Sequence, residues 1–94
     1  MRLCEARVIL TGASGGIGVA IAAALCASGA RVLAVARRGE ALTPLIEQYP
    51  QHLCWVSADL TQLTDRRKVL SAAQAVGGIN LLINAAGVNH FAML

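Results

Sequence analysis

Four short apolar segments are separated by longer segments in which apolar residues recur at helical spacing. The short segments are rich in valine, isoleucine and leucine and do not alternate between apolar and polar positions; they are residues 7–11, 32–35, 53–56 and 81–83. Continuous apolar strands are typical of a parallel sheet that is covered on both faces. The pattern therefore predicts four β-strands in one buried parallel sheet.

The first two intervening segments each predict a helix. In residues 17–28, apolar positions recur at i, i+3, i+4, i+7 and i+8, and Gly29 follows as a C-terminal stop. Residues 42–49 carry a second, shorter pattern that contains Pro44. Because proline is favoured at the first helical position, we expect a short helix with Thr43 as its cap and Pro44 as its first residue.

A third helix is expected between the last two strands. Thr64 is a suitable N-terminal cap, apolar residues follow at helical spacing, and Gly77 and Gly78 end the pattern. The element order is βαβαβαβ, and each crossover is about a dozen residues or longer, as parallel strands require. The fold class is therefore predicted to be α/β, as one domain over residues 1–94.

Composition narrows the class of protein. Of the 94 residues, 56% are hydrophobic, 14% are charged and only 3% are aromatic. This excess of small and aliphatic residues excludes a disordered chain and a coiled coil. The net charge is +3, and the basic residues form only two small clusters, 37–38 and 66–68, so no nucleic-acid partner is expected.

No segment of the chain predicts a membrane span, a metal site or an export signal. The apolar helix 17–28 is shorter than the roughly 20 residues of a membrane-spanning helix, and Glu5 and Arg7 interrupt the N-terminal segment. The three cysteines lack C-x-x-C spacing, and the two histidines lack partners at ligand spacing. We therefore expect a soluble protein of a reducing compartment, the cytoplasm, with no bound metal.

The glycine-rich loop at residues 11–18, T-G-A-S-G-G-I-G, joins the first strand to the first helix. Glycines there let backbone N–H groups approach an anion at the helix N-terminus, where the helix dipole is positive. A Walker A loop is excluded because the only lysine is Lys68, and G-x-G-x-x-G is not met from Gly16 because Ile21 occupies its last position. Phosphate binding is favoured, and a glycine-rich turn used only for close packing is the alternative.

The spacing T-G-x-x-x-G-x-G resembles that of the short-chain dehydrogenase/reductase family. Three further motifs match in order: two arginines, 37–38, after the second strand; aspartate and leucine, 59–60, after the third; and N-A-A-G, 84–87, after the fourth. The one departure is Ala85, which stands where the family usually has a second asparagine. The resemblance covers essentially the whole chain and implies a Rossmann-like, doubly wound parallel sheet in three layers, of which this chain would hold part.

The resemblance assigns cofactor-binding roles to residues that follow the strands. Those beside the pyrophosphate would be Gly12, Gly16, Ile17 and Gly18, with Ser14 near the adenosine ribose. Those around the adenine and its ribose would be Asp59, Leu60, Asn84, Ala85, Ala86 and Gly87. Asp59 would accept a hydrogen bond from the adenine amino group. An ordinary loop aspartate at 59 and a simple strand-ending turn at 84–87 are the alternatives.

The end of the second strand indicates which cofactor is bound. Family members that prefer NAD place an acidic residue there, which accepts from both ribose hydroxyls, whereas this chain has Ala36. Arg37 and Arg38 follow, and guanidinium groups bind phosphate through charge-assisted hydrogen bonds. NADP is therefore the expected cofactor and NAD is less favoured; two solvated surface arginines are the alternative.

No catalytic residue is predicted in these 94 residues. Family members reduce carbonyls or oxidise alcohols with a tyrosine and a lysine four residues later, plus an upstream serine. This chain has one tyrosine, Tyr49, and one lysine, Lys68, nineteen positions apart. The resemblance thus implies the NADP-binding, N-terminal part of a longer oxidoreductase that acts on a small-molecule alcohol or carbonyl and forms a homo-oligomer. A nucleotide-binding chain without chemistry, or a remnant fragment, is the alternative.

The family's strand order is 3-2-1-4, which would leave the strand at 81–83 on an open edge. The first two helices would cover one face of the sheet, and the third would lie nearly alone on the other. Exposed apolar strands with unpaired backbone groups invite association. The isolated chain is therefore expected to self-associate or to be loosely packed.

Overall fold

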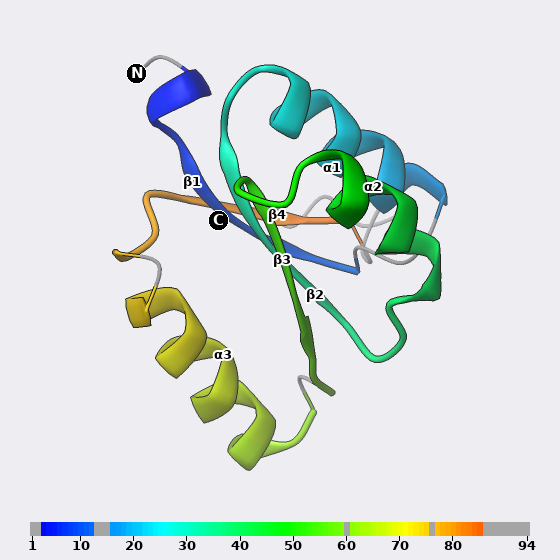
Figure 1. Cartoon of the computed structure of the whole chain (residues 1–94). Helices are drawn as coiled ribbons and strands as arrows, with labels where there is room; N and C mark the ends of the chain where they lie inside the picture. Colours follow the sequence, from blue (N-terminus) through cyan, green and yellow to red (C-terminus); the bar gives the residue numbers. More distant parts are fainter. Residues whose placement is uncertain (1–2, 13–15, 60, 76, 86–94) are drawn as a thin grey trace.

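The structure is a computed structural model that describes residues 3–12, 16–59, 61–75 and 77–85 (Figure 1). Its centre is a sheet of four strands in the order β3-β2-β1-β4, and all three pairings are parallel. The predicted strands and their order are therefore confirmed. The strands are β1 (Arg7–Thr11), β2 (Arg31–Ala36), β3 (Leu53–Ser57) and β4 (Leu81–Asn84).

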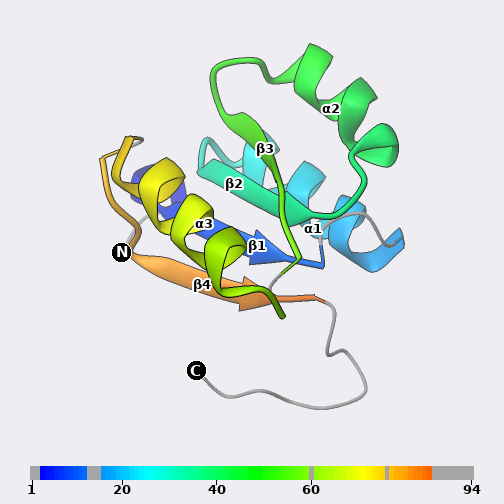
Figure 2. The ribbon, with the colours of Figure 1, turned by 90° about the horizontal axis from the view of Figure 1, so that it is seen from below.

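Among the described residues, three α-helices connect the strands: α1 (Gly16–Ala27), α2 (Thr43–Gln48) and α3 (Leu63–Ala75). Two short 3-10 turns, η1 (Leu3–Glu5) and η2 (Glu40–Leu42), precede β1 and α2. Figures 1 and 2 show α1 and α2 on one face of the sheet and α3 on the other. The chain thus has the three-layer α/β architecture that the sequence predicts.

The two faces of the sheet bury unequal amounts of apolar surface. The larger cluster lies under α1 and α2 and includes Val8, Leu10, Val32, Ala34 and Leu53 of the strands and Ala22, Leu25, Cys26 and Leu42 of the helical segments. The smaller cluster lies under α3 and consists of Val35, Ala58 and Val69, with Ile9 and Val56 packed against it. Burial of apolar side chains is the main contribution to the stability of a fold. The face covered by α1 and α2 therefore contributes most of the stability of this sheet.

Helix α2 begins one residue earlier than predicted. Its first residue is Thr43, directly after η2, and its N-cap residue Leu42 makes no side-chain cap hydrogen bond. The hydroxyl of Thr43 instead donates to the carbonyl oxygen of Gly39 at 3.4 Å. The prediction of Thr43 as the cap was wrong because a 3-10 turn leads directly into this helix. Pro44 still lies in the first turn, where a missing N–H leaves no helical bond unmade.

Helix α3 begins two residues earlier than predicted, at Leu63, so Thr64 lies inside its first turn and is not the cap. The side chain of Asp65 holds this end of the helix to the segment after β3, because its Oδ2 accepts a hydrogen bond from the N–H of Asp59 at 2.7 Å. A carboxylate in the first turn is favoured by the positive end of the helix dipole.

Within the described ranges, no helix combines the length and the apolar character that crossing a membrane requires. Nor does this part of the chain gather three histidine, cysteine, aspartate or glutamate side chains at one point where a metal ion could bind. Cys4, Cys26 and Cys54 are free thiols, and burial raises the pKa of Cys26. The Cys26 thiol therefore stays protonated at neutral pH and serves as a small apolar group of the core.

Candidate nucleotide-binding site

The carboxyl ends of the four strands meet at one edge of the sheet because the strands are parallel (Figure 1). The chain order of the strands reverses beside β1, which has β2 on one side and β4 on the other. In open α/β sheets, ligands bind outside the carboxyl ends of the strands at such a reversal point. The glycine loop, the two arginines and Asp59 follow strands at this edge, and Asn84 is the last residue of β4.

The glycine loop leaves β1 through Gly12, which has a φ of +68°. This left-handed conformation is readily adopted by glycine and disfavoured for residues with a side chain. The loop continues into α1, whose first residue is Gly16. A β-carbon added at Gly16 would meet nothing within 4 Å, so open space lies over the first turn of the helix. Gly18 is buried, whereas Ile17 is 54% exposed.

This open space fits the phosphates of a dinucleotide. The first N–H groups of an α-helix have no partner within the helix, and the dipole there favours negative charge. A group bound at Gly16 would approach the backbone directly, because glycine has no side chain and a β-carbon there would meet nothing within 4 Å among the described residues. Ser14, which the resemblance places near the ribose, lies outside the described residues.

Hydrogen bonds made by Thr11 join the glycine loop to the end of β4. The hydroxyl of Thr11 donates to Oδ1 of Asn84 at 3.0 Å, and the N–H of Ala85 donates to the carbonyl oxygen of Thr11 at 2.9 Å. Thr11 therefore links the first motif to the N-A-A-G motif, a role that sequence reasoning did not assign to it. Ala85 is buried. Ala86 and Gly87, the last residues of that motif, lie outside the described residues.

The two arginines follow β2 and are both exposed. Their backbone is held by two side chains of the neighbouring strand. Trp55 donates its Nε1–H to the carbonyl oxygen of Ala36 at 3.0 Å, and Ser57 donates its hydroxyl to the carbonyl oxygen of Arg37 at 3.1 Å. The backbone at the start of the arginine pair is therefore held to β3.

Asp59 lies beside the arginines and is ionised at neutral pH. Its Oδ1 accepts hydrogen bonds from the hydroxyl of Thr61 at 2.7 Å and from the N–H of Thr61 at 3.0 Å. These two bonds hold the pKa of Asp59 below its usual range, and the positive charge of Arg37 lowers it further. A carboxylate offers about four acceptor positions, so Asp59 has capacity for another donor. Leu60 lies outside the described residues.

Tyr49 and Lys68 are not brought together. Tyr49 follows α2 and packs against the larger core cluster. Lys68 belongs to α3, on the other face of the sheet, and its Nζ donates to the carbonyl oxygen of Ser57 at 2.6 Å. These two side chains therefore do not form a proton-transfer pair.

The sequence motifs assign no role to Trp55 or to Ser57. Their contacts depend on how β3 pairs with β2, which the apolar pattern of the sequence does not specify. Positions 55 and 57 alternate along β3, and their partners in β2 are Ala34 and Ala36. Alanine leaves space beside it, so a long or hydrogen-bonding side chain on the next strand can reach past it to the backbone beyond.

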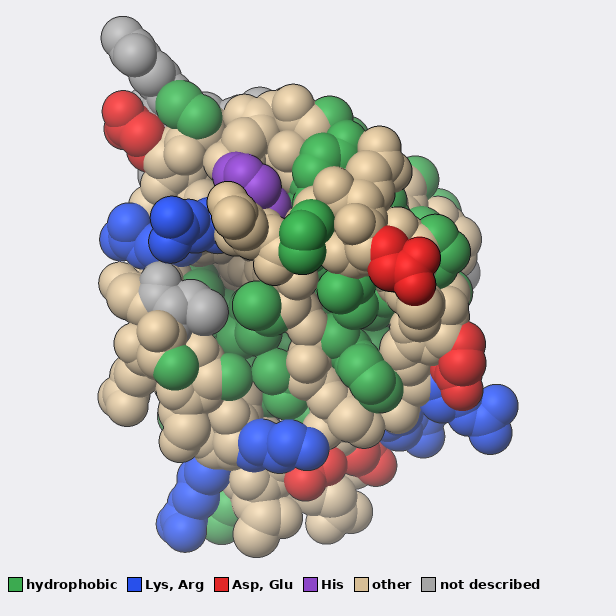
Figure 3. All heavy atoms as spheres, viewed as in Figure 1, with side chains coloured by type: hydrophobic (Ala, Val, Ile, Leu, Met, Phe, Trp, Pro, Cys, Tyr) green, Lys and Arg blue, Asp and Glu red, His purple; other side chains and the backbone are tan. Residues whose placement is uncertain are grey.

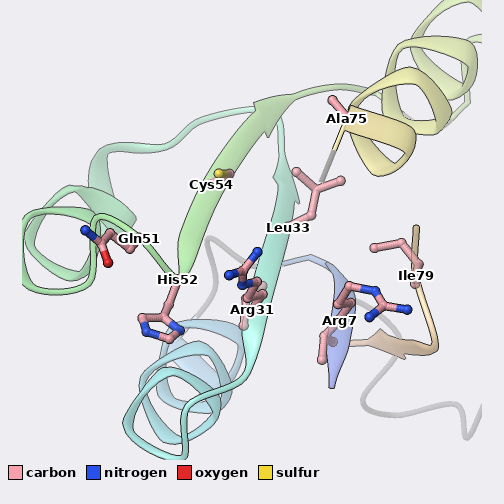
Figure 4. A pocket seen from close by; sticks show the side chains of 10 residues that line it. Arg7, Arg31, Leu33, Gln51, His52, Cys54, Ala75 and Ile79 are labelled. Carbon is pink, nitrogen blue, oxygen red and sulfur yellow. The ribbon is translucent and has the colours of Figure 1, made fainter. Parts of the chain in front are cut away.

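A second hollow of about 220 Å³ opens at the opposite, amino-terminal edge of the sheet (Figure 4). Its lining includes Arg7 and Arg31 from paired positions of β1 and β2, and His52, whose Nδ1 is buried and has no hydrogen-bond partner among the described residues. The Nε of Arg7 donates to the carbonyl oxygen of Gly78 at 3.1 Å. None of the residues predicted to bind the cofactor lines this hollow, so it is separate from the candidate site.

The family model described as short chain dehydrogenase matches residues 6–94. Among curated proteins, L-xylulose reductase from Bos taurus is 39% identical over 88 residues, which cover 94% of this chain and 34% of the reductase. These matches establish that the chain belongs to the short-chain dehydrogenase family. The chain spans about a third of the length of that relative.

Solved structures lead to the same family. A short-chain dehydrogenase from Streptomyces avermitilis is 40% identical, with a TM-score of 0.75 over 83% of this chain and 30% of that one. A short chain oxidoreductase from Pseudomonas aeruginosa PAO1, described as NADPH-bound, is 30% identical, with a TM-score of 0.73 over 84% of this chain and 33% of that one. The Rossmann-like fold predicted from the motifs is therefore confirmed.

Proposed function

We propose that this chain is the nucleotide-binding part of an NADP-dependent short-chain dehydrogenase or reductase that acts on a small-molecule alcohol or carbonyl. One observation carries the choice of NADP. At the edge where the glycine loop opens, Arg37 lies exposed beside Asp59, and the last residue of β2 is Ala36 where an acidic residue would favour NAD. The name of the bovine relative, L-xylulose reductase, and the NADPH bound by the Pseudomonas protein support this assignment.

Each motif would bind a different part of the cofactor. Gly12 and residues 16–18 would hold the pyrophosphate, with Ser14 near the ribose. Arg37 and Arg38 would hold the 2′-phosphate of the adenosine. The adenine and its ribose would contact Asp59, Leu60, Asn84, Ala85, Ala86 and Gly87. When bound, the nicotinamide ring donates or accepts the hydride.

The arginines set the expected size of the preference. A hydrogen bond to a charged group contributes about 1.5–3 kcal/mol, and about 1.4 kcal/mol corresponds to a tenfold change in affinity. One guanidinium on the 2′-phosphate therefore gives NADP an advantage of about ten- to a hundredfold over NAD. Arg37 is the stronger candidate of the two because it directly follows the last residue of β2.

The assignment is tested by calorimetric titration of the chain and of Arg37→Ala with NADPH and with NADH. We expect NADPH to bind more tightly before the substitution and to lose most of that advantage after it. Arg31→Ala is the matched control, because Arg31 is also exposed but lies at the amino-terminal edge of the sheet. Equal affinities of the unsubstituted chain for NADPH and NADH, or an unchanged NADPH affinity in Arg37→Ala, would refute the choice of NADP.

The same 94 residues are expected to show no dehydrogenase or reductase turnover by themselves. They contain one tyrosine and one lysine, and these lie on opposite faces of the sheet. The measurement is NADPH oxidation with a panel of carbonyl compounds, compared with a Gly16→Arg variant that blocks the glycine loop. Turnover above that control would show that a different proton donor is present.

A nucleotide-binding chain without chemistry is the second candidate, favoured by the separation of Tyr49 from Lys68. The coding sequence after Leu94 distinguishes the two candidates. A continuing reading frame with Y-x-x-x-K supports the oxidoreductase, and an immediate stop codon supports the non-catalytic chain. A cytoplasmic location and a homo-oligomeric assembly of the whole protein stay predictions.

A further inference from the structure

We propose that Trp55 and Ser57 are positioning residues that determine the preference for a 2′-phosphate. These two side chains of β3 fix the backbone of residues 36–39, and this places the guanidinium of Arg37 at the adenosine end of the site. The inference rests on the proposed NADP-binding function and extends it to residues that do not themselves touch the phosphate.

The first part of the argument is the pair of hydrogen bonds to consecutive carbonyl groups. The pairing between β2 and β3 ends at Ala36 and Ser57. Trp55 Nε1 donates to the carbonyl oxygen of Ala36 at 3.0 Å, and Ser57 Oγ donates to that of Arg37 at 3.1 Å. The carbonyl oxygen of Ala36 also accepts the N–H of Ala58 at 3.3 Å, so Trp55 adds a second donor to the last carbonyl of the backbone ladder. The hydroxyl of Ser57 then extends the attachment one residue further, to Arg37.

The second part is the contact between the indole and Gly39. A β-carbon added at Gly39 would lie 2.5 Å from Cδ2 and 2.6 Å from Cε2 of Trp55, so the ring rests against the glycine backbone. Gly39 is buried, although Arg37 and Arg38 before it are exposed. The arginine pair is therefore anchored on both sides, at Ala36 and Arg37 by hydrogen bonds and at Gly39 by the ring.

The third part is the attachment of Ser57 itself. Its carbonyl oxygen accepts a hydrogen bond from Nζ of Lys68 at 2.6 Å, which ties the end of β3 to α3. Ser57 is therefore held from α3 while it holds Arg37. A group that is fixed before its ligand arrives loses less conformational entropy on binding, and a planar guanidinium depends strongly on its orientation toward phosphate.

The experiment separates this role from general stabilisation by using two nucleotides that differ only in the 2′-phosphate. We would titrate the chain, Ser57→Ala and Trp55→Phe with 2′,5′-ADP and with 5′-AMP by calorimetry. Each substitution removes one hydrogen bond to the arginine segment, and Trp55→Phe retains an aromatic ring. We expect the affinity for 2′,5′-ADP to fall about three- to tenfold and the affinity for 5′-AMP to change less than about twofold.

Ser28→Ala is the matched control, because Ser28 also donates its hydroxyl to a backbone carbonyl, that of Ala24 at 3.0 Å, but at the far end of α1. It should leave both affinities unchanged. Circular dichroism checks that every variant is folded. If Trp55→Phe is unfolded, the result for Ser57→Ala alone decides the outcome.

Arg37→Ala completes the design. If this variant loses the 2′-phosphate preference while Ser57→Ala retains it, the positioning role is wrong and the proposed function stands. An equal loss for both nucleotides in Ser57→Ala shows a merely structural role and also overturns the inference. If Arg37→Ala itself has no effect, the NADP assignment fails, and the inference fails with it.

Discussion

Gly16 and Gly39 are both glycines at the carboxyl edge of the sheet, but they are required for different reasons. At Gly16 an added β-carbon would meet nothing within 4 Å, whereas at Gly39 it would meet the ring of Trp55 at 2.5 Å. The first position is open toward the candidate ligand, and the second is filled by the protein. Alanine at Gly16 is therefore a probe of binding, and alanine at Gly39 is a probe of packing.

We expect Gly39→Ala to lower the free energy of unfolding by about 1–3 kcal/mol, the usual cost of forcing an extra carbon into a packed site. Gly16→Ala should leave that free energy nearly unchanged, because alanine is well tolerated in a helix, and should weaken NADPH binding. Urea denaturation and NADPH titration of both variants provide the measurements. A Gly16→Ala protein that binds NADPH as tightly as the parent would show that the phosphates do not lie there.

Single residues also show where sequence reasoning ends. Arg37 and Asp59 could be proposed as cofactor-binding residues because each stands shortly after a strand, and in the structure the charge of Arg37 lowers the pKa of Asp59. Trp55 could not be assigned a partner, because the carbonyl that its indole reaches belongs to Ala36, nineteen residues earlier. That contact depends on the register of two strands, which the apolar pattern does not specify.

At the scale of elements, the strands were predictable to within one residue and the starts of the helices less well. Strand positions follow from apolar runs, which lie in the buried sheet. The start of a helix depends on which polar group accepts hydrogen bonds from its first backbone N–H groups, and several neighbouring side chains can do so. Thr64 has the preferred residue type for a cap, but the helix begins at Leu63 and Asp65 makes the contact to Asp59.

The connection from β3 to α3 should make stability depend on pH. The pKa of Asp59 is lowered, chiefly by the hydrogen bonds of Thr61. Ionised Asp59 therefore stabilises the fold above its unfolded-state pKa of about 3.9, and this contribution is lost as the pH falls through the lower folded-state value. Thr61→Val removes the hydroxyl bond and should bring the pKa of Asp59 closer to its ordinary value.

The expected result is a Thr61→Val protein that is less stable than the parent at pH 7, with a difference that shrinks as the pH falls below about 4. Urea denaturation at a series of pH values measures the difference, and a carbon-detected NMR titration of Asp59 measures the pKa. A stability difference that is independent of pH would show that the hydroxyl acts through packing and not through the charge of Asp59.

For the whole molecule, the unequal faces of the sheet are the dominant feature. Figure 3 shows hydrophobic side chains gathered over β3, between α2 and α3. Trp55 of β3 is 40% exposed, and Leu70 of α3 and Leu82 of β4 are 61% and 43% exposed. β3 and β4 form the two edges of the sheet, so each has a side without a partner strand in the described part of the chain.

The chain by itself should therefore self-associate. Unpaired strand edges and exposed apolar side chains favour contact with another copy. Sedimentation velocity over a range of concentrations should show species larger than the monomer, and Leu82→Lys should reduce them by placing a charge on the β4 edge. A single monomeric boundary at all concentrations, together with a sharp thermal transition, would contradict this expectation.

The order of the strands was predictable only through the motifs. Apolar runs and crossover lengths indicate a parallel sheet, but they do not state which strand pairs with which. The resemblance carried by residues 11–18 and 84–87 supplied the order 3-2-1-4, and the pairings of β1 with β2 and with β4 agree with it. The two unequal faces then follow, because two helices lie on one side and one on the other.

Trp55 is the only tryptophan in the sequence, and its ring lies against Gly39, directly beside the two arginines. Any ultraviolet emission of the chain therefore originates mainly from one indole at the adenosine end of the candidate site. An anion that settles on Arg37 would change the electric field at that indole and shift its emission. If the proposed site binds NADP, the chain carries its own fluorescent reporter of nucleotide occupancy and needs no attached dye.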